Sequence, residues 1–176
     1  MSVLETVLPA GTWNVDPAHT TVEFAVRHMG LATIKGRAAG FSGSLVDGRL
    51  EGEVDASTIT THEADRDAHL ASPDFFDVER HPRLRLVTTE IERDGDELVA
   101  RAALTVRGVT RPVELRGRVT GQGVDPWGNE RVGIELEGTI DRSEFGLKWN
   151  APLPGGGFLL EDDVKLFISV SAVKAA

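Results

Sequence analysis

Polar and apolar residues alternate along most of this chain, and alternation with a period of two predicts β-strands that bury one face. In residues 21–28 the apolar row is Val22, Phe24 and Val26, and His28 continues it. The same pattern returns in five further segments: 50–56, 98–106, 113–119, 132–140 and 164–170. Residues 83–91 are ambiguous, because their apolar side chains change face midway.

Short turn signals separate these segments. Asp47-Gly48, Asp94-Gly95 and the stretch DPWGNE at 125–130 are typical of hairpin turns, which join antiparallel neighbours. About eight strands are available, and closing them into a barrel removes the edges that long alternating strands would expose. The pattern therefore predicts an all-β fold, an eight-stranded antiparallel barrel, in a single domain over residues 1–176.

One stretch, residues 60–82, replaces the alternation with helix-forming residues. Thr60 and Glu63 have the spacing of a capping box, so we expect a short inserted α-helix over about 61–71. Its alanines form only a thin apolar stripe, which predicts a helix resting on the surface or over an opening. The Phe75-Phe76 pair that follows would anchor it.

A second exception is residues 145–162, FGLKWNAPLPGGGFLLED, which are too long and too rich in Pro and Gly for a hairpin turn. Long loops in compact domains are often lids or binding loops. The apolar faces also contain small residues, and these favour a barrel with an internal cavity for one small ligand. Alternatively, the glycines among them mark bends and bulges of the sheet. The residues are Gly52, Ala100, Ala102, Gly117 and Gly138.

Composition narrows the classes of partner. A formal net charge of −9 argues against nucleic acids and anionic membrane surfaces, because both reward clustered Lys and Arg. The chain has no cysteine, which excludes thiol chemistry and thiolate metal sites. No apolar run approaches the ~20 residues that span a bilayer. The first residues lack the basic and apolar regions of a secretory signal, so we expect a cytoplasmic protein.

Histidines are the remaining candidates for catalysis. Asp16 could pair with His19, although an Asp-Pro turn is the better explanation of Asp16. His62-Glu63 resembles the start of a zinc-protease motif, but the second histidine ligand is missing. His62 and His69 would lie two helical turns apart, ~10 Å, which is too far to share one metal ion without a bent geometry. We therefore expect no catalytic residue, no metal site and no cofactor.

Several motifs together resemble the YceI family in order and spacing. They are WNVDPAHTTVEFAVRHMG with IKGRAAGFSG, then RDAHLASPDFFD followed by HPRLRL, then LTVRGVTRPV, and last DRSEFGL. The likeness runs from about residue 12 to 173. It implies a lipocalin-like, eight-stranded antiparallel barrel with a helix beside it, which binds polyisoprenoids or similar long-chain amphiphiles such as quinones and fatty-acid derivatives. It does not imply an enzyme.

The resemblance places residues of this chain at family motif positions. They are His19, Phe24, His28, Phe41, Arg66, His69, Leu70, Phe75, Phe76 and Phe145. From the strand pattern we expect an inward set to wrap the apolar tail of a ligand: Val22, Phe24, Val26, Leu104, Leu115, Leu136 and Leu166. Aromatic residues would narrow the tunnel or close its mouth: Phe41, Phe75, Phe76, Trp149 and Phe158. A polar or phosphorylated head would meet Arg66, His69 or Lys148.

The first hypothesis is therefore a barrel that sequesters or carries an isoprenoid or another long-chain lipid. The alternative is an enzyme with a His/carboxylate site, with or without a metal ion, built from His19, His62 or His69 with Glu63 or Asp65. A homodimer would suit a barrel of this kind, although no stripe of surface residues demands one.

Overall fold

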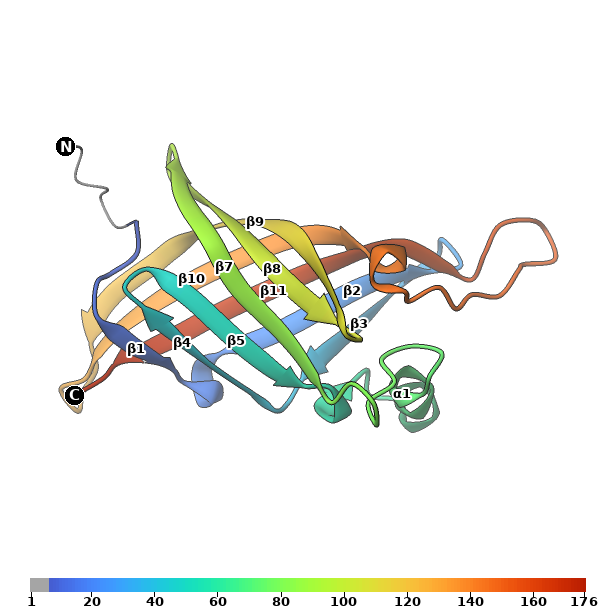
Figure 1. The fold of residues 1–176 in the computed structure, drawn as a ribbon, viewed down its shortest axis with the longest axis horizontal. Helices are drawn as coiled ribbons and strands as arrows, with labels where there is room; N and C mark the ends of the chain where they lie inside the picture. The colour runs from blue at the N-terminus through green and yellow to red at the C-terminus, as the bar shows by residue number, and fades with distance from the viewer. Residues whose placement is uncertain (1–6) are drawn as a thin grey trace.

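A computed structural model describes residues 7–176, and β-strands dominate it (Figure 1). The strands are β1 (Thr12–Val15), β2 (Thr21–His28), β3 (Ala32–Ala38), β4 (Phe41–Val46), β5 (Arg49–Asp55), β6 (Ile59–Thr60), β7 (Arg83–Asp94), β8 (Glu97–Val106), β9 (Val109–Val124), β10 (Glu130–Asp141) and β11 (Leu160–Lys174). The α-helix is α1 (Ala64–Ala71), and the short 3-10 helices are η1 (Pro17–His19), η2 (Ala56–Thr58) and η3 (Arg142–Phe145).

The strands close into an antiparallel barrel. Strands β1 and β2 both pair with β11 and are separated only by η1, so together they make one bent strand. Strands β3 and β4 make a second, since β3 pairs with β2 and β4 pairs with β1. The circuit then runs through β5, β7, β8, β9 and β10 back to β11. The predicted eight-stranded antiparallel barrel with one short helix is confirmed.

The ambiguous pattern at 83–91 has a structural cause. These residues belong to β7, whose pairing with β8 shifts register between Thr88 and Glu90. The extra residue of a β-bulge turns the following side chains to the opposite face. Leu86 before the bulge and Ile91 after it can therefore both pack against the buried core.

Helix α1 begins later than the capping-box spacing predicted. The Glu63 side chain accepts hydrogen bonds from the backbone N–H groups of Asp65 and Arg66, so Glu63 is itself the N-cap. The Thr60 hydroxyl instead donates to the carboxylate of Asp67, at 2.8 Å. The prediction of a surface helix was correct, because no residue of α1 is fully buried.

The larger of the two buried apolar clusters includes side chains at the end of the barrel where β1 and β11 meet. Leu8 and Trp13 fill this end together with Leu45, Leu115 and Ala172, and each of these side chains is almost inaccessible to solvent. The indole N–H of Trp13 donates to the carbonyl of Ala10, which satisfies its polar atom within an apolar surrounding. We call this end of the molecule the closed end.

Candidate functional site

A cavity of about 560 Å³ occupies the barrel toward the end that carries α1, which we call the open end. Its wall is formed by inward side chains of the barrel strands together with α1, the turn after it, and the loop that precedes β11. The lining is predominantly aliphatic and aromatic. Polar groups come both from α1, as Arg66 and His69, and from the strands, as Glu23, Glu53 and Arg85. Its volume and character are those of a site for a small apolar ligand.

The alternation that identified β2 explains how this strand contributes to the wall. Val22, Phe24, Val26 and His28 all line the cavity and are half-buried, because they face an open space instead of packed side chains. A Cβ atom on Gly36 would lie 2.3 Å from the Phe24 ring. Glycine at this position of β3 therefore leaves the room in which Phe24 lies across the neighbouring strand.

Most of the predicted binding residues lie on this wall. They are Val22, Phe24, Val26, His28, Phe41, Arg66, His69, Leu70, Phe75, Phe76, Leu104, Trp149 and Leu166. The structure brings them together from β2, β4, α1, β8, β11 and the two long connections. Whether they contact a ligand stays a prediction.

Four predicted residues lie elsewhere. Leu115 and Leu136 point inward, but they belong to the closed-end core, where opposing side chains meet and leave no space. Phe145 is buried within η3 in a separate apolar cluster with Phe75 and Leu147. Phe158 lies on the loop before β11, where it forms an isolated bridge with Pro152; it is 65% exposed and does not line the cavity.

Most of the small residues that favoured a cavity in the sequence do not line it. Only Gly52 lines the space. A Cβ atom on Gly117 would lie 1.7 Å from the carbonyl oxygen of Glu135, and one on Gly138 would lie 2.7 Å from that of Glu114. Both glycines allow close approach between strands, as the alternative interpretation held. Ala100 and Ala102 are buried in packed surroundings.

Aromatic rings narrow the mouth of the cavity. The His69 ring of α1 packs edge-on against Trp149, with centroids 4.6 Å apart, and against Phe75 at 5.0 Å. Phe75 and Trp149 themselves lie 5.5 Å apart. The imidazole Nε2 lies 2.9 Å from a carboxylate oxygen of Asp74. This cluster joins the helix to the loop before β11, so opening the mouth requires these rings to separate.

Polar groups beside the mouth are held in fixed orientations. Arg66 donates from Nε to the Thr61 hydroxyl at 2.7 Å and from Nη2 to the Thr61 carbonyl at 2.8 Å. Burial raises the pKa of the Asp67 carboxyl, but hydrogen bonds from Thr61 and Thr60 outweigh this effect and lower it overall. A guanidinium thus lies on the cavity wall, where it can bind an acceptor on a ligand.

Arg142 is a wall residue that the strand pattern did not single out. Its Nη1 donates to the carbonyls of Leu147 and Trp149, and its Nε donates to that of Glu161, so it ties the long loop to β11. Nη2 finds no hydrogen-bond acceptor among residues 7–176 and lies 3.7 Å from an Asp162 oxygen. Burial lowers the pKa of this guanidinium. Its position in DRSEFGL is the signal that could have marked it.

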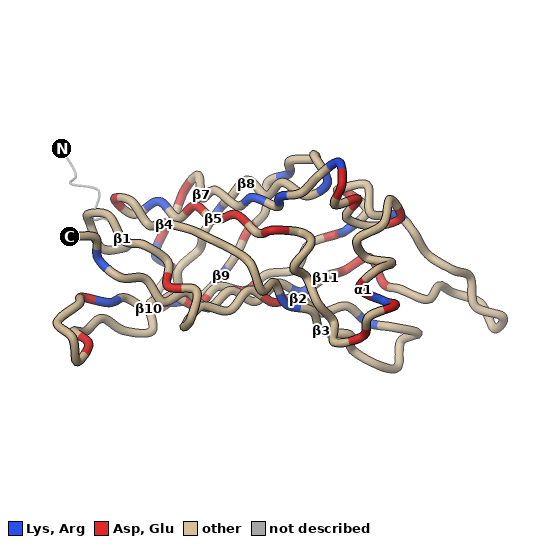
Figure 2. The backbone as a smooth tube through the Cα atoms, turned by 90° about the horizontal axis from the view of Figure 1, so that it is seen from below, with Lys and Arg blue, Asp and Glu red and all other residues tan. Residues whose placement is uncertain are grey.

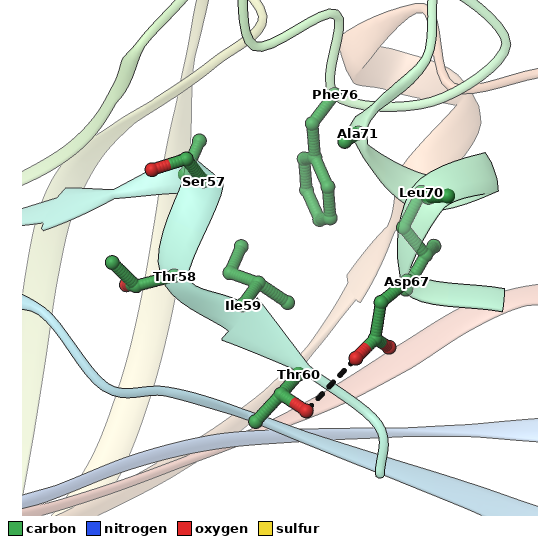
Figure 3. A pocket seen from close by; sticks show the side chains of 10 residues that line it. Ser57, Thr58, Ile59, Thr60, Asp67, Leu70, Ala71 and Phe76 are labelled. Atoms are coloured by element: carbon green, nitrogen blue, oxygen red, sulfur yellow. Dashed lines mark hydrogen bonds between the residues drawn. The ribbon is translucent and has the colours of Figure 1, made fainter. Parts of the chain in front are cut away.

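A smaller cavity of about 360 Å³ lies outside the first, between α1 and the segment of η2 and β6 (Figure 3). Ile59, Leu70 and Phe76 line both cavities and form the partition between them. Figure 3 also shows the hydrogen bond from Thr60 to Asp67 that joins β6 to the helix. The partition is therefore built from apolar side chains of β6, α1 and the turn after the helix, and β6 pairs with β3 through only two residues.

The histidines do not assemble a common site. His19 lies away from the cavity and pairs with Asp16 at 2.7 Å, and Asp16 also caps η1 by accepting from the N–H of Ala18. Arg131 joins Asp16 at 2.8 Å to Asp125 at 2.7 Å. Across the described residues, no group of three or more His, Asp or Glu side chains is placed to hold a metal ion. Nor does any helix of that region reach the length and apolarity needed to cross a membrane.

Solved structures share the fold. A crystal structure of BcnA from Burkholderia cenocepacia superposes with a TM-score of 0.72 at 16% identity and covers 89% of this chain and 98% of its own. A polyisoprenoid binding domain from Saccharophagus degradans, implicated in plant cell wall breakdown, gives a TM-score of 0.69 at 12% identity over 93% and 98%. At these identities the likeness establishes the barrel alone.

Sequence relatives are closer. Protein YceI of Escherichia coli O157:H7 is 33% identical over 163 residues, which cover 89% of this chain and 82% of the relative. A UPF0312 protein of Pectobacterium atrosepticum has the same identity and coverage. The family model for the YceI-like domain matches residues 13–172, so the chain belongs to the YceI-like domain family.

Proposed function

We propose that this protein binds a polyisoprenoid or a similar long-chain amphiphile in the cavity of its barrel. One observation carries the proposal, namely a cavity of about 560 Å³ whose wall is predominantly aliphatic and aromatic. A preformed apolar space favours a flexible hydrocarbon, because burial of its surface is worth roughly 25 cal/mol per Å². The polyisoprenoid-binding relative of the same fold supports this class of ligand.

The polar end of such a ligand would lie near α1. The helix brings three charged or titratable residues to the wall, Asp65, Arg66 and His69. Arg66 and His69 are the two that can donate a hydrogen bond to an anionic head, and Arg66 is already oriented by Thr61. A phosphate, carboxylate or quinone carbonyl could accept a charge-assisted hydrogen bond there, while the tail extends along β2 and β11. We therefore expect a phosphorylated prenyl chain to bind more tightly than the corresponding alcohol.

The geometry of the mouth favours binding of the ligand over its chemical conversion. The alternative enzyme was expected to pair a histidine with Glu63 or Asp65. In the structure His69 pairs instead with Asp74, and its imidazole packs against Phe75 and Trp149. We assign this pair to the architecture of the mouth. Stoichiometric metal that is lost in His69→Ala, or turnover that depends on pH, would favour the enzyme instead.

The proposal is tested by measuring prenyl-ligand binding to a variant in which a larger side chain fills the cavity. In native mass spectrometry we expect the wild-type protein to bind geranylgeraniol and geranylgeranyl phosphate, and Leu166→Trp to lose both, because Leu166 lines the cavity. Lys165→Trp is the matched control, since Lys165 is exposed on the other face of β11. Equal binding by the two variants, or none by the wild type, would contradict the proposal.

A further inference from the structure

Three exposed apolar side chains gather on two hydrogen-bonded loops beside the cavity. Leu31 is 80% exposed and Met29 is 44% exposed at the turn between β2 and β3, and Phe158 is 65% exposed on the loop before β11. The Met29 N–H donates to the carbonyl of Leu159 at 2.7 Å, which holds the two loops together. His28 and Leu159, their neighbours in sequence, line the cavity. We call Met29, Leu31 and Phe158 the apolar rim.

The charge around the rim differs from that of the whole chain. The formal net charge is −9, yet residues 24–46 and 145–160 contain no Asp or Glu. They carry Arg27, Lys35, Arg37 and Lys148, all of them exposed. Figure 2 shows the outer part of the long loop without charged residues and Lys or Arg positions along β2 and β3. Acidic residues resume on α1 and at Glu161, Asp162 and Asp163, an exposed run beside the end of β2. The basic positions therefore cover the side of the mouth formed by β2, β3 and the loop at 145–160.

From these two features we infer that the rim docks on a lipid bilayer that contains anionic lipid. Apolar side chains at loop tips can enter the interfacial region, while basic residues behind them meet lipid phosphates, each worth about 1 kcal/mol near an anionic surface. A second protein copy fits less well. Three partly exposed side chains offer ~400 Å² at most, below the ~800 Å² per partner of a stable interface.

Docking at this place would put the cavity mouth against the membrane. A long-chain ligand could then leave the bilayer and enter the barrel without crossing water, a step that costs ~0.8 kcal/mol for each exposed CH₂ group. In this respect the inference rests on the proposed function. The docking itself does not, because it depends on surface residues outside the Leu166 region of the cavity.

Vesicle flotation tests the inference, and a substitution at the closed end of the barrel is the control. We expect the wild type to float with phosphatidylcholine vesicles that contain phosphatidylglycerol, and less with phosphatidylcholine alone. The double variant Leu31→Ser/Phe158→Ser should lose ~tenfold or more of its partitioning. Trp127→Ser should not change it, although Trp127 is 81% exposed, because it lies between Asp125 and Glu130 at the closed end.

Further variants distinguish membrane docking from ligand binding and from self-association. Lys35→Glu/Lys148→Glu should remove the preference for phosphatidylglycerol, and Leu166→Trp should still float. Docking is overturned if the wild type stays unbound, if Trp127→Ser loses as much as the rim variant, or if the rim variant only dissociates a dimer in sedimentation. If Leu166→Trp and wild type bind geranylgeraniol alike while the rim behaves as expected, the proposed function fails and the docking stands.

Discussion

The two ends of the barrel use the same strands for different purposes. At the closed end, Leu45, Leu115 and Ala172 fill the interior completely, and the ion pairs of Arg131 hold the β9–β10 turn to η1. At the open end, residues on the same inward faces surround a cavity, and two of the loops there, the β2–β3 turn and residues 145–160, are free of acidic residues. The difference teaches that an inward strand position specifies burial only where the opposite wall is close enough to touch.

The largest expected contrast in the free energy of unfolding comes from replacing one leucine at each end of the barrel by alanine. Leu115→Ala should lower the free energy of unfolding by about 3 kcal/mol, because it leaves a void in packed surroundings. Leu84→Ala should cost about 1 kcal/mol, because Leu84 already borders an open space. Urea unfolding of both variants measures the contrast, and equal costs would contradict the distinction between the ends.

A second contrast concerns the ion pairs of the closed end. Arg131→Met should lower the free energy of unfolding clearly more than the loss of an exposed ion pair does, since the carboxylates of Asp16 and Asp125 both lose a charged donor. Arg118→Met is the control, because its pair with Glu135 is exposed and 3.8 Å long. Its cost should stay below about 1 kcal/mol, and a comparable loss in both variants would remove the special role of Arg131.

The same network predicts a dependence on pH. Hydrogen bonds from Arg131 and His19 lower the pKa of Asp16 from 3.8 to about 2. Because the pKa is lower in the folded protein, the stabilisation is present above pH 3.8 and is lost as the pH falls toward 2. Asp16→Asn should therefore be less stable than wild type at pH 6, by less than Arg131→Met. Thermal melts across this range should show the two proteins converging, and a constant difference would contradict the assignment.

The smallest expected effect is at the open end. Trp149→Ala removes one ring of the cluster with His69 and Phe75, and such aromatic contacts are worth about 1 kcal/mol. We expect a bound prenyl chain to dissociate about threefold to tenfold faster, with little change in the free energy of unfolding. Stopped-flow displacement measures the rate. Trp127→Ala is the matched control, and an equal acceleration there would contradict a role for the mouth.

Individual elements show which parts of the structure the sequence could predict. Alternation located β2 and its row Val22, Phe24 and Val26 correctly, because a strand's face follows from its own period. The helix was expected from about 61 but begins at Ala64, since the Thr60 hydroxyl is engaged by Asp67 instead of capping. Leu115 and Leu136 were expected on the cavity wall, but strand period alone cannot tell a filled level of the barrel from an open one.

For predicting contact with membranes, the net charge of the chain was less informative than the distribution of charges over its surface. A total of −9 predicts avoidance of anionic membranes, whereas the fold brings two acid-free segments to one side of the mouth. These segments are separated by about half the chain, and the hydrogen bond between Met29 and Leu159 joins them. The cytoplasmic location and the homodimer stay predictions.

By itself the sequence determined the barrel, the inserted helix and the family, because period-two alternation, turn residues and motif spacing are local properties of the chain. Only the tertiary structure decided where the barrel is filled and where it is hollow. That depends on which side chains from distant strands meet, as with Gly117 against Glu135 at the closed end and Gly36 beneath Phe24 at the open one. Packing between strands is a non-local property, and the cavity is its consequence.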